Sequence, residues 1–309
     1  MRILEQLITT SRRATGNQDY SDTAGVADSE FIQAFNDAQE EIHAILNSMF
    51  PTILMAEKYQ DVSIGVETYS IPTDCYMGTR IDNISYSPSG LDQDYYPIRK
   101  GSLKERIDGI NGNPSFYLRQ GSNLIIQPPP QQGGKLRIIY QKSIPYLDIV
   151  RGTVSSVTLG TNTITSLILD TTTNLDTDAL NEQPYMTICD KYGNIKMKNI
   201  KIDSVNSSTG VVNITSGFTF ESGETIAVGD YAFRGKYSSN VSQLPDICEK
   251  YLLEYCNMRV FVRDSSTDQA ELAALLQKIE GTLRSAFAEP DNDPDRIPII
   301  DPFYLGYEL

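Results

Sequence analysis

Residues 28–50 read DSEFIQAFNDAQEEIHAILNSMF, and the period of this stretch decides the fold that the sequence predicts. Its apolar residues recur at alternating spacings of four and three, which places them on one face of a helix. The members of this face are Phe31, Phe35, Ala38, Ile42, Ile45 and Met49. Asp28 or Ser29 can cap the first turn, and Pro51 ends the helix near Phe50. We therefore expect a long helix with one core-facing side.

Helical patterns return near the other end of the chain. Leu244-Pro245-Asp246 places proline at a helix start, and the following run is apolar enough to be mostly buried. Its members are Ile247, Tyr251, Leu252, Tyr255 and Val260. A last helix, from Ser265 or Ser266 to before Pro290, carries the stripe Leu272, Leu276, Ile279, Leu283 and Phe287. We expect these two helices and helix 28–50 to pack together as a bundle that is discontinuous in sequence.

The residues between these helices have the alternating period of β-strands. Residues 59–64 and 67–71 flank Gly65 and are typical of a hairpin. Residues 80–86, 116–119, 123–127 and 135–142 are further candidate strands, and 102–107 is a candidate short helix. Together they predict a small antiparallel β unit.

A second β region begins at Gly152, where the composition shifts toward Thr, Ser, Asn, Val and Ile. Strand-length runs and turn signals such as Tyr192-Gly193-Asn194 favour a separate all-β module, either a barrel or a sandwich. The predicted fold class is therefore α+β. We expect one domain made of the helix and β unit in 1–151 and completed by helices in 234–290, an inserted module in 152–233, and an extended arm in 291–309.

Composition excludes several classes of function. The chain has 26 Lys plus Arg against 40 Asp plus Glu, a formal charge of −14, and no stretch gathers its cations into a patch. Tight binding of a nucleic-acid backbone needs such a patch. No window approaches the roughly 20 apolar residues of a membrane span, and the first residues lack the pattern of a signal peptide. We expect a soluble protein with no membrane partner.

The side chains that carry most enzyme chemistry are scarce. His43 is the single histidine, it lies within the long predicted helix, and no G-x-S-x-G motif accompanies it. Cys75, Cys189, Cys248 and Cys256 form no C-x-x-C pair, which is typical of buried free thiols in a reducing compartment. The sequence therefore predicts no catalytic residue, metal site or cofactor. Paired carboxylates keep one alternative open, a hydrolase that acts on polysaccharide.

An apolar and aromatic segment follows the polar, irregular residues 291–296. Its prolines favour an extended arm over a helix. Such an arm either folds back on its own domain or docks on a neighbouring subunit or a partner protein. The candidate docking residues are Ile297, Ile299, Ile300, Phe303, Tyr304, Leu305 and Tyr307.

Several short motifs, taken in order, resemble the head-to-tail adaptor family of short-tailed phages, also called tail tubular or gatekeeper proteins. Residues 67–74 (ETYSIPTD) are similar to its Y-x-L-P-x-D step, and Tyr96-Pro97-Ile98 to a P-I turn. Residues 112–118 (GNPSFYL) resemble its G-x-P-x-x-Y element, and 124–130 with 136–140 resemble its closing hairpin. The resemblance covers about 29–147 and 240–288, whereas 152–233 matches nothing specific.

The resemblance implies a structural virion protein that assembles in the host cytoplasm into a ring, typically a dodecamer, in the neck or tail. The ring would dock under the portal protein, extend the DNA channel, and connect it to the tail nozzle or fibre proteins. Double-stranded DNA would pass without specific binding, because an acidic lining repels phosphate. The family pattern contains no catalytic residues to transfer. The β insert keeps another alternative open, a fibre-attachment or receptor-binding virion protein.

Overall fold

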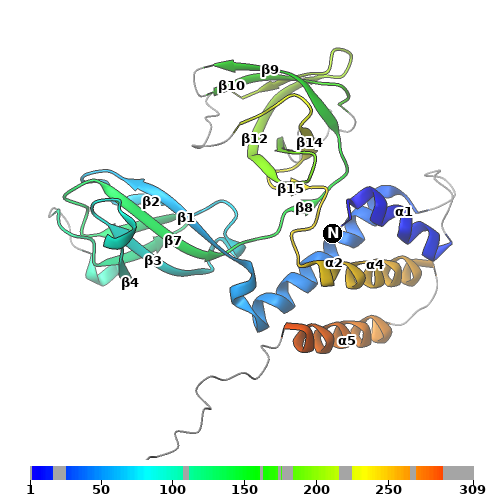
Figure 1. Cartoon of the computed structure of the whole chain (residues 1–309), viewed down its shortest axis with the longest axis horizontal. Helices are drawn as coiled ribbons and strands as arrows, with labels where there is room; N and C mark the ends of the chain where they lie inside the picture. Colours follow the sequence, from blue (N-terminus) through cyan, green and yellow to red (C-terminus); the bar gives the residue numbers. More distant parts are fainter. Residues whose placement is uncertain are drawn as a thin grey trace, which may run out of the picture.

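The computed structural model describes residues 2–16, 26–106, 111–160, 163–172, 175, 184–215, 225–264 and 269–287. Within these ranges the fold is mixed α+β, as the sequence predicts. A group of helices, a curled sheet and a closed barrel surround a central connecting region (Figure 1).

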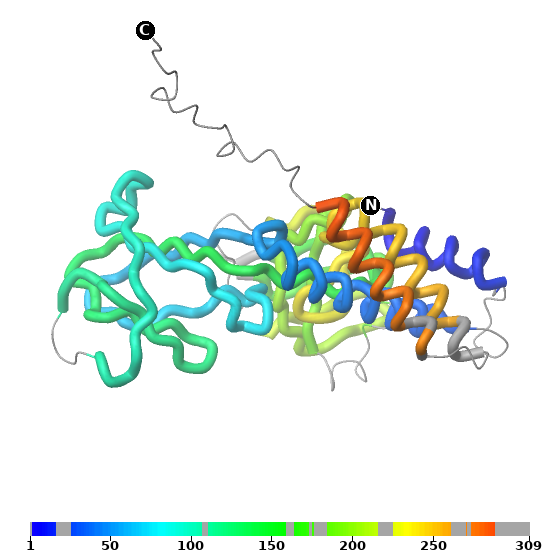
Figure 2. Tube along the Cα trace, turned by 90° about the horizontal axis from the view of Figure 1, so that it is seen from below, coloured from blue at the N-terminus to red at the C-terminus, as the bar shows by residue number. Residues whose placement is uncertain are grey.

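The described helices come from both ends of the chain and gather at one end of the molecule (Figure 2). They are α1 (Leu4–Thr15), α2 (Asp28–Met49), α4 (Glu249–Asp264) and α5 (Gln269–Phe287). The expected end of α2 before Pro51 is confirmed. The expected capping is wrong, because the N-cap is Ala27 and makes no side-chain bond. The Asp28 carboxylate instead forms an ion pair with Arg12 of α1, at 2.7 Å.

One hydrophobic cluster joins the four helices. Phe31, Phe35, Ile42, Ile279 and Leu283 are buried in it, while Ile45, Met49, Leu276 and Phe287 are partly buried against it. The side chain of Leu272 lies outside the described residues. Ile247 departs from the predicted buried run, since 45% of it is exposed within the short 3₁₀ turn Asp246–Cys248. The arrangement of these helices as a bundle stays a prediction.

The first β region is a curled seven-stranded sheet in the order β1-β7-β3-β4-β5-β6-β2. The strands are β1 (Met55–Val62), β2 (Thr68–Ser70), β3 (Ile81–Ser87), β4 (Tyr96–Lys100), β5 (Phe116–Gln120), β6 (Asn123–Gln127) and β7 (Gly134–Gln141). Its concave core contains Ile84, Tyr86, Leu124, Leu136 and Ile138.

The hairpin predicted around Gly65 is wrong. β1 pairs with β7, and β2 pairs with β6 at the other end of the sheet order. A turn does form, with Gly65 at φ 72°, but it carries the chain across the curled sheet instead of folding it back on itself. Two other expectations also change: β4 and β5 are parallel, and the predicted helix at 102–107 is a 3₁₀ turn over Leu103–Glu105 within the described residues.

The second β region is a closed barrel in the order β10-β13-β12-β11-β14-β9, so a barrel replaces the alternative of a sandwich. Its strands are β9 (Gly152–Gly160), β10 (Thr163–Leu169), β11 (Tyr185–Cys189), β12 (Ile195–Asn206), β13 (Val211–Ile214) and β14 (Tyr231–Arg234). Two glycines allow close backbone approach at one seam. A Cβ atom on Gly152 would lie 2.1 Å from the Thr171 carbonyl oxygen, and one on Gly210 would lie 2.1 Å from that of Leu169.

Candidate functional site

The helices, sheet and barrel meet where the chain passes into and out of the barrel. We call residues 142–148, which leave β7 for the barrel, the strap. Its strand β8 (Tyr146–Leu147) pairs in parallel with β15 (Ser238–Ser239) of the returning chain. The Tyr146 amide donates to the Tyr237 carbonyl at 2.9 Å, and the Asp148 amide to the Ser239 carbonyl at 3.0 Å. The two connections therefore support each other side by side.

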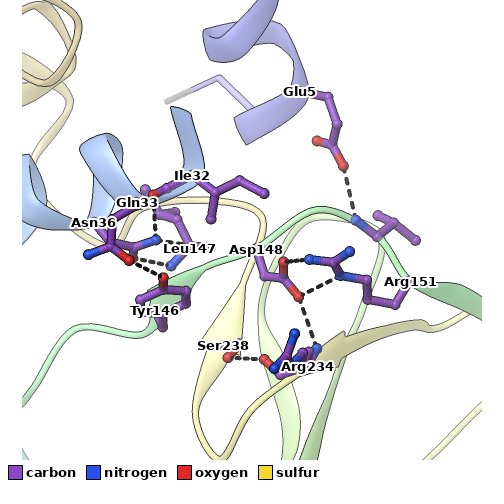
Figure 3. A network of polar contacts seen from close by, with 11 residues as sticks. Glu5, Ile32, Gln33, Asn36, Tyr146, Leu147, Asp148, Arg151, Arg234 and Ser238 are labelled. Atoms are coloured by element: carbon purple, nitrogen blue, oxygen red, sulfur yellow. Dashed lines mark hydrogen bonds and ion pairs between the residues drawn. The ribbon is translucent and has the colours of Figure 1, made fainter. Parts of the chain in front are cut away.

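Buried polar side chains of α2 bind the backbone of the strap, and Figure 3 shows the contact of Asn36 with Leu147. Asn36 donates to the Leu147 carbonyl at 2.8 Å and accepts from the Leu147 amide at 2.7 Å. Gln39 donates to the Pro145 carbonyl at 2.7 Å, and His43 Nε2 lies 3.2 Å from the Lys142 carbonyl oxygen. The spacing of three and four along α2 puts all three on one face, so the helix fixes the path of the strap.

A buried ion pair lies where the chain enters the barrel, just before β9. Arg151 donates from Nε and Nη2 to the two carboxylate oxygens of Asp148, at 3.0 and 2.6 Å. The Arg234 backbone amide also donates to Asp148, at 3.0 Å. The neighbouring Val150 amide donates to Glu5 of α1 at 3.1 Å (Figure 3). The carboxylate of Asp148 thus connects the strap to Arg151, just before the first barrel strand, and to Arg234 at the end of the last one.

A second polar contact joins the barrel to the sheet. Asp74 accepts from the Tyr140 hydroxyl at 3.0 Å and lies 3.2 Å from Lys198 Nζ on β12. Burial alone would raise the pKa of Asp74, but the Lys198 ammonium and the Tyr140 hydroxyl outweigh it and lower that pKa. The last residue of the ETYSIPTD motif is therefore a structural link between two modules.

A cleft of about 950 Å³ opens beside this junction. Its walls come from α2, the strap, the loop at Thr73 and the β14 end of the barrel, and they include Arg151, Arg234, Lys236 and Tyr237. Among the described residues, no group of three or more His, Cys, Asp and Glu side chains is placed to hold a metal ion. The geometry is that of a structural joint between the helices, the sheet and the barrel, with a cleft beside it.

The match to a known family decides what this joint belongs to. A family model described as SU10 adaptor protein matches residues 3–165, more than half of the 309 residues. The chain belongs to the SU10 adaptor protein family. A search of the curated proteins found no match.

The family match confirms the resemblance to head-to-tail adaptors seen in the sequence. It extends over α1, α2, the curled sheet, the strap and the first strand of the barrel, so it includes the residues that bind the strap. Membership in the SU10 adaptor family implies a phage structural protein of the neck or tail, and a role that is structural and not enzymatic. In the described part of this adaptor, no helix is long and apolar enough to cross a bilayer.

The structure describes some of the predicted site residues of the adaptor and not others. The apolar positions of α2 and α5 with described side chains lie in or against the shared cluster. The seven docking residues of the predicted arm lie outside the described residues, and their role stays a prediction. Burial raises the pKa of the Cys189, Cys248 and Cys256 thiols to about 12, which disfavours the reactive thiolate. Sequence reasoning missed Asn36 and Gln39, whose signal was two amides at helical spacing from His43.

His43 gives the adaptor a testable pH dependence. Burial lowers the pKa of His43 below its ordinary value of 6.5, although the bond to the Lys142 carbonyl opposes this. Because the folded state favours the neutral ring, the contribution to stability is complete above pH 6.5 and is lost as the pH falls through the lowered folded pKa. The free energy of unfolding, measured by urea denaturation, should therefore decrease from pH 6.5 downward.

The variant His43→Gln serves as the control for this titration. His43 is the only histidine, so the slope of stability against pH just below 6.5 should become nearly flat in the variant. An unchanged slope would show that another group titrates.

Proposed function

We propose that this adaptor forms a ring that docks under the portal, extends the DNA channel and links it to the tail nozzle or fibres. The observation that carries the proposal is the family match across α1, α2, the sheet and the strap. The junction supports it physically. A neck component transmits force between head and tail, and here buried hydrogen bonds and ion pairs fix three modules to one another.

The charge of the chain suits a channel through which DNA moves. With a formal charge of −14, the protein would repel phosphates where a basic lining would retain them by counterion release. The acidic balance therefore favours passage of the genome without specific binding.

Exposed apolar side chains of the curled sheet are candidates for contacts between subunits or with other neck proteins. Ile64 and Val66 at the turn after β1 are 65% and 42% exposed, and Leu103 in the turn after β4 is 68% exposed. Met77 and Leu91 in other turns of the sheet are 68% and 55% exposed. Burial of such residues in a ring would remove their apolar surface from water.

The proposal is tested with the purified full-length protein, alone and mixed with its portal protein, by sedimentation velocity and electron microscopy. We expect closed rings, and rings stacked on the portal in the mixture. Deletion of 291–309 should leave a folded protein, with an unchanged circular dichroism spectrum, that fails to join portal-containing particles. If the protein stays a monomer both alone and with the portal protein, ring formation is rejected. If the truncated form joins portal-containing particles normally, docking by residues 291–309 is rejected.

The alternative of a receptor-binding insert gains little from the described barrel. A glycan site would expose several tyrosines together. Among the described tyrosines of the barrel, Tyr192 alone is exposed, at 67%, while Tyr185, Tyr231 and Tyr237 are partly buried.

A further inference from the structure

The cleft at the junction continues into a second depression along α2. The second pocket has a volume of about 230 Å³ and shares Gln33, Ser143, Ile144 and Tyr146 with the cleft. We call the two together the junction groove. It follows α2 and the strap and ends at the β14 end of the barrel, so it has the elongated form that suits an extended peptide.

One wall of the junction groove carries cations without carboxylate partners. Arg234 is partly buried and Lys236 is exposed, and neither side chain forms an ion pair within the described residues. Lys236 Nζ lies 4.6 Å from the centre of the Tyr185 ring. Asp148, the carboxylate in the same cleft, is already occupied by Arg151 and the Arg234 amide. This end of the groove therefore attracts an anion.

Two polar groups of residues that line the groove have no hydrogen-bond partner within the described residues. Gln39 is 2% exposed and lines the smaller pocket, and its Oε1 has no partner within the described residues. The Tyr237 hydroxyl in the cleft is likewise unpartnered there. Leaving a buried acceptor unpaired costs about 1–3 kcal/mol. A simple anion offers no N–H group, whereas a peptide with acidic side chains offers both N–H groups and carboxylates.

The chain itself contains a peptide of this chemistry beyond α5. Residues 291–301 read DNDPDRIPIID, with carboxylates at Asp291, Asp293 and Asp295 followed by apolar residues. The apolar part could contact Ile32 and Ile144 in the groove. Asp291 lies four residues after Phe287, so an extended chain places it at most about 14 Å from the end of α5.

The position of α5 favours a second copy as the source of this peptide. Phe287, the last residue of α5, packs against Phe50 just beyond α2, with ring centres 5.6 Å apart. In Figures 1 and 2, α5 and the barrel lie on opposite sides of α2. The segment would have to pass around its own helices to enter its own groove, whereas a neighbouring copy can present its groove directly.

We propose that the junction groove receives residues 291–301 of a second copy of this chain, with the aspartates against Arg234 and Lys236. The inference rests on the proposed ring, because a contact from tail to groove is heterologous and generates rings when it closes. It assigns the acidic segment to the contact between neighbouring subunits.

A charge exchange tests the contact in the full-length protein. The groove variant carries Arg234→Glu and Lys236→Glu, and the tail variant carries Asp291→Lys, Asp293→Lys and Asp295→Lys. Each variant alone should associate at least about tenfold more weakly than the parent in sedimentation velocity, since like charges then face each other. An equimolar mixture should recover association, because each tail then meets a groove of opposite charge on the other variant.

Controls separate the contact from folding and from general charge effects. Lys191→Glu with Lys201→Glu changes two exposed barrel cations outside the groove and should leave association unchanged. Lys236→Glu alone, whose side chain is exposed, should keep the parent's thermal unfolding midpoint and still weaken association.

Three outcomes overturn the proposal. Recovery only when both sets of changes are in one chain would place the tail in its own groove. If the parent forms rings and the groove and tail variants associate as strongly as the parent, the groove contact is rejected and the proposed function stays intact. A parent protein that stays a single copy even with the portal would reject both.

Discussion

Replacing Asp148 with alanine is expected to destabilise the protein by about 3–5 kcal/mol, because it leaves a buried arginine without its partner. The side chains of Arg151 and Asp148 are only 10% and 4% exposed, so water has little access to the guanidinium and cannot solvate it once the carboxylate is gone. The Arg234 amide also loses its acceptor at the last barrel strand. We expect a lower urea midpoint and faster hydrogen exchange at Arg234.

A double variant distinguishes the loss of the ion pair from the cost of leaving Arg151 buried without a partner. Asp148→Leu with Arg151→Met removes both ions and fills the space with apolar groups, which is often nearly neutral. It should therefore recover most of the stability lost in the single variant. A single variant within about 1 kcal/mol of the parent would contradict the structural role assigned to this pair.

Replacing Asn36 with leucine is expected to cost about 2–6 kcal/mol, since it leaves the amide and the carbonyl of Leu147 unpaired in a buried place. Asn36 is 7% exposed, and Leu147 is fully buried. Hydrogen exchange at the Leu147 amide is the direct measurement, because this amide donates to Asn36. Its protection should fall more than that of amides in the centre of the barrel.

Gln33→Ala is the matched control on the same helix. Gln33 is exposed, donates to Asp37 at 2.7 Å and accepts from the Tyr146 hydroxyl at 3.3 Å. Because both hydrogen bonds are exposed to water, its removal should change stability by at most about 0.5 kcal/mol. If both variants lose stability equally, the loss reflects the helix in general and not the binding of the strap.

Local periodicity predicts a large part of this fold. The apolar stripe of 28–50 gives α2 almost to the residue, and the change of composition at Gly152 marks where the barrel begins. The prediction of a hairpin at Gly65 fails because the pairing partners of β1 and β2 are strands that lie far away in the sequence. β1 matches β7 over eight residue pairs, from Met55 with Gln141 to Val62 with Gly134, and this long register outweighs a local turn.

The joint itself was much less predictable. Asn36 and Gln39 bind backbone groups 111 and 106 positions away, and any residue type can present a backbone carbonyl. The sequence of the strap therefore gives no indication that Asn36 and Gln39 bind it. Asp148 and Arg151 are three residues apart, but a carboxylate and a guanidinium at that spacing are common on solvated surfaces, and only the folded chain shows that they are buried.

The way the barrel is attached has an evolutionary consequence. Gly152 and Ala232, near its two ends, are direct partners on adjacent strands, and the connections on either side run together through β8 and β15. A folded unit whose termini lie one strand apart can be grafted onto or removed from its host with little disturbance. Phages that share this scaffold can thus exchange or lose the barrel while the helices and the curled sheet keep their structure.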